Sequence, residues 1–193
     1  MFRYFIIESV YAIAEQAQTF IHFFEDMMHI DQIETYDHAL IIYFKGDSNI
    51  NISDVIVNLS SDTLSDIRLF ESYRFKTVHE RDKNLGYIQT LLTKIPIAKY
   101  TYLNEQAVLF HLIHHIDETF FPCFLKTYAT DQTMLNSIRV YLESNQNTSY
   151  ASKQLFIHRN TLIQRIDKFI DVTGFDIREF IPGYLIYSLL TKQ

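Results

Sequence analysis

The sequence predicts an α+β protein, in which a small α+β N-terminal unit is followed by an all-α C-terminal unit. Short β-branched and aromatic runs, which are typical of strands, occur before about residue 103 and not after it. Through the rest of the chain, apolar residues recur at three- and four-residue steps, as on one face of a helix. With 193 residues, 48% of them hydrophobic, the chain can bury a core in one or two small domains. We therefore expect residues 1–100 to form the α+β unit and residues 101–193 the helical region.

In the N-terminal unit, helical and strand patterns alternate along the chain. Apolar residues from Ser9 to Met28 share one helical face and predict a first helix. The run Ala39–Phe44 is β-branched and aromatic, and it ends at turn-forming residues 45–49, so it predicts a buried strand. A helix is predicted over His79–Lys94, because Pro96 then stops it. Two further predictions are a short helix over Ile52–Leu59 and a half-exposed strand over Asp66–Phe75.

The C-terminal region is predicted to be helical throughout. Asn104–Ile116 and Thr130–Glu143 carry apolar residues at helical spacing, and an apolar stretch around Pro122 separates them. Tyr184–Leu190 predicts a closing apolar helix, preceded by a glycine, Gly174, that suits a helix C-cap.

Residues 148–170, TSYASKQLFIHRNTLIQRIDKFI, have the organisation of two helices joined by a tight turn. A short helix over Ser149–Leu155 contains the small pair Ala151 and Ser152, which lets a second helix cross closely. After a turn at Phe156 and Ile157, a longer helix is expected to start near His158. This pattern predicts a helix-turn-helix.

The longer helix is amphipathic, with apolar residues on one face and polar residues on the other. Arg, Asn and Gln near the start of such a helix can pair with guanine or adenine edges, and Lys, Arg and Thr can hold phosphates. The polar face therefore predicts DNA recognition. The apolar face contains Leu162, Ile166, Phe169 and Ile170; the candidate base contacts are Arg159, Asn160 and Gln164; the candidate phosphate contacts are Thr161, Arg165 and Lys168.

The motif LFIHRNTL at residues 155–162, followed by Arg165-Ile166 and by residues 173–176, resembles the C-terminal helix-turn-helix of PucR/CdaR-type bacterial transcriptional regulators. Residues 134–138 and 141–143 resemble the helix that precedes it in that family, and the likeness extends over residues 120–190. The resemblance implies a recognition helix that begins at His158, with Arg159, Asn160 and Thr161 facing DNA. His158, as the first residue of that helix, is also a candidate DNA-binding residue. It also implies a bacterial transcription factor whose N-terminal region is reduced or divergent.

Charge is unevenly distributed between the two parts of the chain. The whole chain carries −6, whereas residues 131–193 contain seven Lys and Arg against six Asp and Glu, so the first 130 residues carry −7. Such an acidic part is repelled by DNA and suits contacts with protein or a ligand. We therefore expect the N-terminal unit to be a reduced sensor or dimerisation region that takes an unknown effector or protein partner, in a homodimer presenting two recognition helices.

Several other classes of function are not predicted. The four glycines are too dispersed for a phosphate-binding loop, and the common hydrolase motifs are absent, so no enzymatic activity and no cofactor are expected. His111 and His115, and likewise His114 and Glu118, have the four-residue spacing of metal ligands, but the same helix packs apolar residues and no metal site is predicted. The single cysteine, Cys123, and the acidic residues that interrupt the apolar N-terminus indicate an unprocessed cytoplasmic protein without a membrane span.

The sequence therefore predicts a sequence-specific DNA-binding transcriptional regulator. The alternative is a protein-interaction or scaffold module that retains the helix-turn-helix fold without binding DNA. The acidic net charge, together with Ile163 and Gln164 on the recognition helix, favours that alternative.

Overall fold

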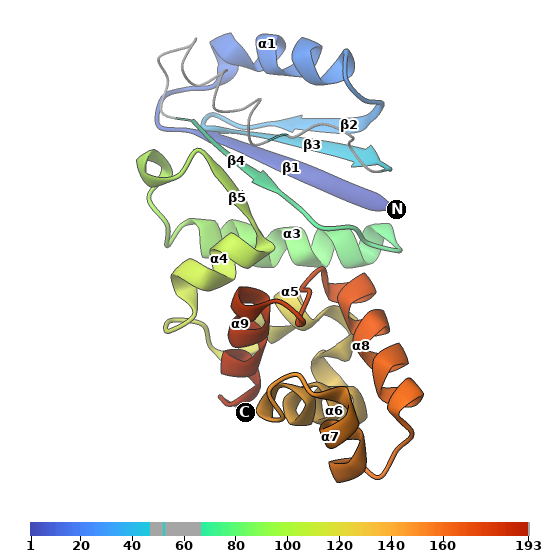
Figure 1. Ribbon diagram of the computed structural model, residues 1–193. Helices are drawn as coiled ribbons and strands as arrows, with labels where there is room; N and C mark the ends of the chain where they lie inside the picture. Colours follow the sequence, from blue (N-terminus) through green and yellow to red (C-terminus); the bar gives the residue numbers. More distant parts are fainter. Residues whose placement is uncertain (47–51, 53–66, 193) are drawn as a thin grey trace. The chain divides into compact units, whose positions relative to one another are not determined.

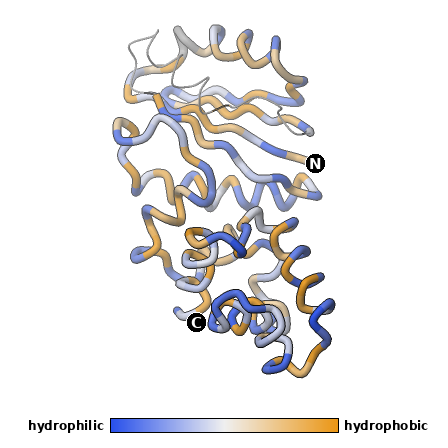
Figure 2. Tube along the Cα trace, viewed as in Figure 1, coloured by the Kyte–Doolittle hydropathy of each residue, from blue (hydrophilic) through white to orange (hydrophobic). Residues whose placement is uncertain are grey.

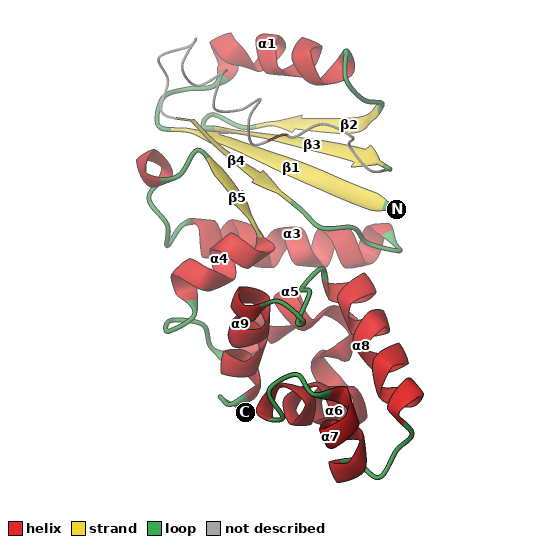
Figure 3. Ribbon diagram, in the orientation of Figure 1, coloured by secondary structure: helices red, strands yellow, loops and turns green. Residues whose placement is uncertain are grey.

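The structure is a computed structural model that describes residues 1–46, 52 and 67–192. Its contacts divide the chain into an N-terminal unit, Met1–Val108, and a C-terminal unit, Leu109–Gln193. The overall fold is α+β, as predicted, with a sheet in the N-terminal unit and helices in the C-terminal unit (Figure 3).

The N-terminal unit is built on a five-stranded sheet, counted over its described residues, with the strand order β2-β3-β1-β4-β5. Neighbouring strands are antiparallel except for β4 and β5, which run parallel. Helix α1 covers one face of this sheet and helix α3 covers the other (Figure 1). The bounds are β1 (Phe2–Ser9), α1 (Ala14–Glu25), β2 (Ile30–Thr35), β3 (Ala39–Lys45), β4 (Ile67–Glu71), α3 (Val78–Leu92), a 3₁₀ turn at Ile97–Lys99 and β5 (Tyr102–Asn104).

The central strand, β1, was not predicted from the sequence. The first helix begins at Ala14 rather than at Ser9, because Ser9 is the last residue of β1. Strand β1 pairs with β3 on one side and β4 on the other, and its residues 4–7 are buried on both faces of the sheet. A strand buried on both faces is continuously apolar, and this pattern does not distinguish it from a buried helix.

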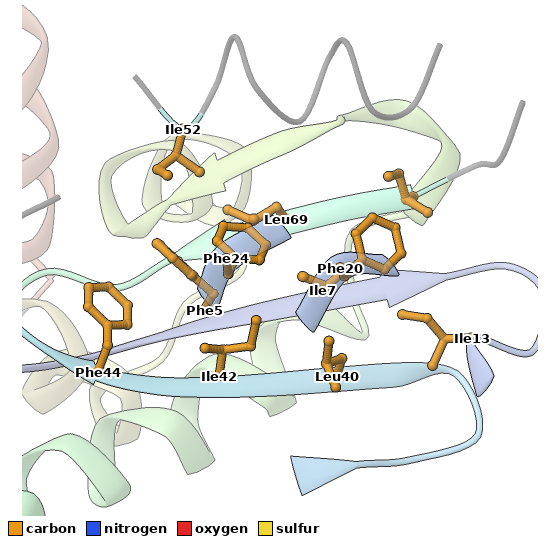
Figure 4. Packing of buried hydrophobic residues seen from close by; sticks show 11 residues of the cluster. Phe5, Ile7, Ile13, Phe20, Phe24, Leu40, Ile42, Phe44, Ile52 and Leu69 are labelled. Carbon is orange, nitrogen blue, oxygen red and sulfur yellow. The ribbon is translucent and has the colours of Figure 1, made fainter. Parts of the chain in front are cut away.

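The sheet face toward α1 carries a large apolar cluster. Phe20 and Phe24 of α1 pack on side chains from the three central strands (Figure 4). Phe5 of β1 is at the centre of this cluster, with its ring centroid 5.3 Å from that of Phe24 and 4.5 Å from that of Phe44. The core of the N-terminal unit itself therefore buries Phe20 and Phe24 of α1.

The face toward α3 contains a buried ion pair. The Arg68 guanidinium, only 1% exposed, lies on β4 and contacts the Glu8 carboxylate of β1, with Nε–Oε2 and Nη2–Oε2 distances of 2.9 and 2.5 Å. The same guanidinium donates to the carbonyl oxygens of Leu92 and Ile95, at and just beyond the end of α3. This network ties the C-terminus of α3 to the middle of the sheet.

The remaining N-terminal elements follow the sequence with shifted ends. Strand β3 and helix α3 occupy the predicted segments, and a capping box between Thr77 and Glu80 starts α3. Strand β4 is shorter than the predicted Asp66–Phe75, and it is buried rather than half-exposed, because helices cover both faces of the sheet (Figure 1). The predicted helix Ile52–Leu59 lies outside the described residues except for Ile52. Strands β2 and β5 were not predicted, because β2 is largely exposed and polar and β5 has three residues.

The C-terminal unit is helical over its described residues, and α4 spans the boundary between the units. Its core contains fully buried aliphatic and aromatic residues of α5, α6, α8 and α9, among them Phe124, Leu135, Phe169 and Leu185. The bounds are α4 (Glu105–Leu112), a 3₁₀ turn at Glu118–Phe120, α5 (Phe121–Leu125), a 3₁₀ turn at Lys126–Thr130, α6 (Gln132–Glu143), α7 (Thr148–Gln154), α8 (Arg159–Thr173) and α9 (Phe180–Leu190).

Candidate nucleic-acid interface

Helices α6, α7 and α8 pack against one another and form the candidate site (Figure 1). Helix α7 is capped by Asn147, whose side-chain oxygen accepts hydrogen bonds from the backbone N–H groups of Ser149 and Tyr150, each at 3.1 Å. Ala151 and Ser152 are buried, so the small pair allows the close helix crossing that the sequence predicts.

The turn between α7 and α8 is tight and apolar. Figure 2 shows it as a hydrophobic segment between hydrophilic stretches. The Phe156 N–H donates to the Lys153 carbonyl at 3.2 Å, and the Ile157 N–H donates to the Ser152 carbonyl at 3.1 Å. Phe156 has a left-handed backbone, with φ of 53°, and its side chain is 95% exposed. An exposed aromatic residue in this conformation is uncommon, because a Cβ atom disfavours positive φ.

Both ends of α8 are capped. His158 is the N-cap, and its Nδ1 accepts a hydrogen bond from the Asn160 N–H at 3.2 Å. At the other end, Gly174 adopts a left-handed conformation with φ of 81°, as its predicted C-cap role requires. The helix therefore extends over the 15 residues from Arg159 to Thr173.

The two faces of α8 differ as the sequence predicts. Leu162, Ile166 and Phe169 are buried against the rest of the unit. Four of the candidate DNA-binding residues are exposed on the other side: Asn160, Thr161, Gln164 and Lys168. Their side chains project from the helix where a ligand can reach them.

The two arginines of α8 have different surroundings. Arg159 is exposed, and its Nε donates to the Thr148 hydroxyl of α7 at 3.0 Å. Arg165 is half-buried, and its Nη1 donates at 2.6 Å to the hydroxyl of Ser137, a buried residue of α6. That hydroxyl in turn donates to the Thr133 carbonyl at 2.7 Å. Both arginines therefore join α8 to a neighbouring helix.

Sequence reasoning did not single out Thr148 or Ser137. Thr148 is 11 positions away from Arg159, and Ser137 is 28 positions away from Arg165. Small hydroxyl residues of this kind are common at helix termini and in helix interiors. No sequence signal distinguishes a hydroxyl that meets an arginine of another helix.

Acidic residues limit the basic character of the site. Asp167 and Asp171 are exposed in the second half of α8, and Asp167 lies 3.4 Å from the Arg178 guanidinium. Arg178 also forms an ion pair with Asp176 at 2.8 Å, which lowers the pKa of the Asp176 carboxyl below its ordinary value. The exposed side of α8 therefore carries Arg159, Asn160, Thr161 and Gln164 in its first half, whereas Lys168 lies among the carboxylates of its second half.

The histidines flagged by spacing do not form a metal site in the structure. Within the described part of the chain, no group of three or more His, Cys, Asp or Glu side chains is placed to hold a metal ion. His114 and His115 are exposed, and Cys123 is buried. Among the described residues, no helix is long and apolar enough to cross a membrane.

The packing of α6, α7 and α8, the tight turn and the exposed polar face together define a helix-turn-helix domain. Residues 134–181 match the family model of the PucR C-terminal helix-turn-helix domain. The C-terminal unit of this chain therefore carries a PucR-type helix-turn-helix, in agreement with the resemblance seen in the sequence.

Similarity to two individual proteins covers about a third of the chain. The chain is 35% identical over 66 residues to the uncharacterized protein YxkF of Bacillus subtilis, covering 34% of this chain and 22% of YxkF. It is 40% identical over 71 residues to the proline-responsive transcriptional activator PutR of Bacillus subtilis, covering 35% of this chain and 17% of PutR. The chain thus spans about a fifth of the length of these relatives.

One solved structure aligns with nearly the whole chain. It is the regulator of polyketide synthase expression from Bifidobacterium adolescentis, with a TM-score of 0.43 and 13% sequence identity, covering 99% of this chain and 79% of that one.

Proposed function

We propose that this protein is a transcriptional regulator that binds specific sites on double-stranded DNA through α8. The observation that carries the proposal is the arrangement of hydrogen-bonding side chains at the start of a capped, exposed helix in a PucR-type helix-turn-helix domain. Regulation of transcription is supported by the similarity to PutR, which is a transcriptional activator. The relatives are bacterial proteins, and the DNA of a bacterium lies in its cytoplasm, so we place this protein there.

In this proposal, the first half of α8 enters the major groove. Arg159, Asn160 and Gln164 meet base edges, because Arg pairs with guanine, and Asn and Gln pair with adenine. Thr161 and Lys168 meet phosphates, which fix the position of the helix but carry no sequence information. His158 holds the N-terminus of α8 through its capping hydrogen bond. Arg165 adds a phosphate contact through the guanidinium nitrogens that do not bond to Ser137.

The exposed carboxylates Asp167 and Asp171 favour a second candidate function, that of a protein-interaction module that kept the fold but not DNA binding. Salt dependence separates the two. For a DNA-binding protein, the logarithm of the binding constant falls linearly with the logarithm of the salt concentration, and the slope is set by the number of phosphates neutralised. A scaffold module shows no duplex binding at low salt.

The test begins by selecting duplexes from a random double-stranded library with the intact chain. Arg159→Ala and Asn160→Ala are each expected to weaken binding to the selected duplex by about 1–3 kcal/mol, the value of a bidentate base contact. Asn136→Ala is the matched control, because Asn136 is an exposed asparagine of α6. Equal affinities for the wild type and all three variants would reject the assignment of α8 as the reading helix.

We also propose that the chain acts as a homodimer, with the acidic N-terminal unit as its sensor or dimerisation region. One short helix reads only a half-site, and regulators of this kind gain affinity by presenting two helices about 34 Å apart. Light scattering of the intact chain with and without the selected duplex tests this arrangement. A single 22.9 kDa chain per particle, both free and bound to the duplex, contradicts it.

A further inference from the structure

The contact between Arg159 and Thr148 joins the first residue of α8 to the first residue of α7. The Arg159 Nε donates to Thr148 Oγ1 at 3.0 Å, although the two residues are 11 positions apart. Nε is the nitrogen nearest to the aliphatic stem of arginine, so this bond restrains the plane of the guanidinium group. A side chain that would otherwise sample many rotamers is thereby held over the N-terminal ends of both helices.

The bond leaves the outer end of the Arg159 guanidinium available. The side chain is exposed, and within the part of the chain that the structure describes neither Nη1 nor Nη2 has a hydrogen-bond or ion-pair partner. Two neighbouring N–H donors at the outer end form the fork that matches the O6 and N7 acceptors of guanine in the major groove. Thr148 and a guanine base can therefore bind the same guanidinium simultaneously, on different nitrogens.

Restraint of this kind affects affinity because arginine has a large side-chain entropy. Immobilising a long side chain on binding weakens an interaction by about 2- to 12-fold, and a side chain that is already held loses less. Thr148 itself is half-exposed at the start of α7, where its hydroxyl has no structural role in capping, since Asn147 caps that helix.

We infer that Thr148 is a positioning residue for DNA recognition, whose hydroxyl holds the Arg159 guanidinium with its two terminal nitrogens directed at a guanine. This inference rests on the proposed function, and it assigns to α7 a part in specificity that the sequence motif on α8 does not contain. It requires that the effect of Thr148 on DNA binding depend entirely on the presence of Arg159.

The experiment measures binding of the intact chain to the selected duplex and to random duplex. Thr148→Val removes the hydroxyl with little change of shape, and it is expected to weaken binding to the selected duplex about 2- to 10-fold. Thr148→Ser keeps the hydroxyl and is expected to bind within about 2-fold of the wild type. Binding of the Thr148→Val variant to random duplex and its melting temperature are expected to match the wild type, which a general loosening of the domain would not allow.

The decisive comparison places Thr148→Val in the Arg159→Ala background. If Thr148 acts through Arg159, the second substitution causes no further loss, because the group that it positions is already absent. A loss of the same size in both backgrounds shows instead that Thr148 contacts DNA itself and overturns the inference. The inference also fails if Thr148→Val binds like the wild type, or if Thr148→Ser is as weak as Thr148→Val.

These outcomes are separate from failure of the proposed function. If the wild type does not bind duplex at low salt, or if Arg159→Ala leaves specific binding unchanged, the proposed function or its reading helix is wrong. If Arg159→Ala weakens binding and Thr148→Val does not, the proposed function stands and only the role of Thr148 is rejected.

Discussion

Phe156 allows a direct test of the geometry of the turn between α7 and α8. Its backbone is left-handed, with φ of 53°, and its ring is almost fully exposed. Glycine adopts this conformation without the steric conflict that a Cβ atom creates. Phe156→Gly is therefore expected to stabilise the C-terminal unit, although it replaces a large apolar residue with the smallest one.

The size of the effect follows from three contributions. A left-handed conformation costs a residue with a Cβ atom about 1–2 kcal/mol, and glycine removes this cost. The greater conformational freedom of glycine in the unfolded chain reduces this gain in stability by about 0.5–1 kcal/mol. The ring contributes almost nothing, because only 5% of the residue's surface is removed from solvent. The net gain lies within about 0–1.5 kcal/mol, and its central value of about 0.75 kcal/mol corresponds to about 3–6 °C in Tm for a unit of this size.

Thermal unfolding followed by far-ultraviolet circular dichroism measures the shift, and amide exchange of α7 and α8 places it in the C-terminal unit. Phe156→Ala is the matched control, since it removes the ring but keeps the Cβ atom and its strain, and it is expected to melt within about 0.5 kcal/mol of the wild type. The reasoning is refuted if Phe156→Gly lowers Tm, or if the two variants raise it equally.

Three further substitutions test the rest of the structure. Leu162→Ala creates a cavity under α8 and is expected to lower the free energy of unfolding of the C-terminal unit by about 2–5 kcal/mol; melting like the wild type would mean that the helix face is assigned wrongly. Glu8→Gln leaves the buried Arg68 guanidinium without its carboxylate and is expected to lower the free energy of unfolding in urea by about 3 kcal/mol. Lys45→Met, which breaks an exposed ion pair, is the control and is expected to lower it by less than about 1 kcal/mol. Asp171→Asn removes a negative charge from the exposed side of α8 and is expected to tighten duplex binding by about 0.2–1 kcal/mol at low salt. High salt screens this charge and is expected to abolish the effect. Unchanged affinity at low salt would indicate that this half of the helix lies away from the phosphates.

The sequence by itself determined the local features of the helix-turn-helix. The buried and exposed faces of α8 follow from the 3.6-residue period, and the C-cap at Gly174 follows from a residue type that suits helix ends. The start of the helix near His158 was also predicted, although the capping role of the His158 side chain was not. These features depend on residues within one or two helical turns of each other, and such short-range information is present in the amino-acid order. The same holds for β3, where turn-forming residues mark the end of an apolar run.

Only the tertiary structure decided that residues 2–9 form the central strand, because a run of apolar residues fits a strand or a helix until its neighbours are known. It also decided which residues of other helices the two arginines of α8 contact. Arg159 meets a hydroxyl of α7 and remains exposed, whereas Arg165 meets a buried hydroxyl of α6. The physical reason is that each contact depends on how α8 crosses another helix, and the crossing is set by packing of the whole unit rather than by residues near the arginine in the chain.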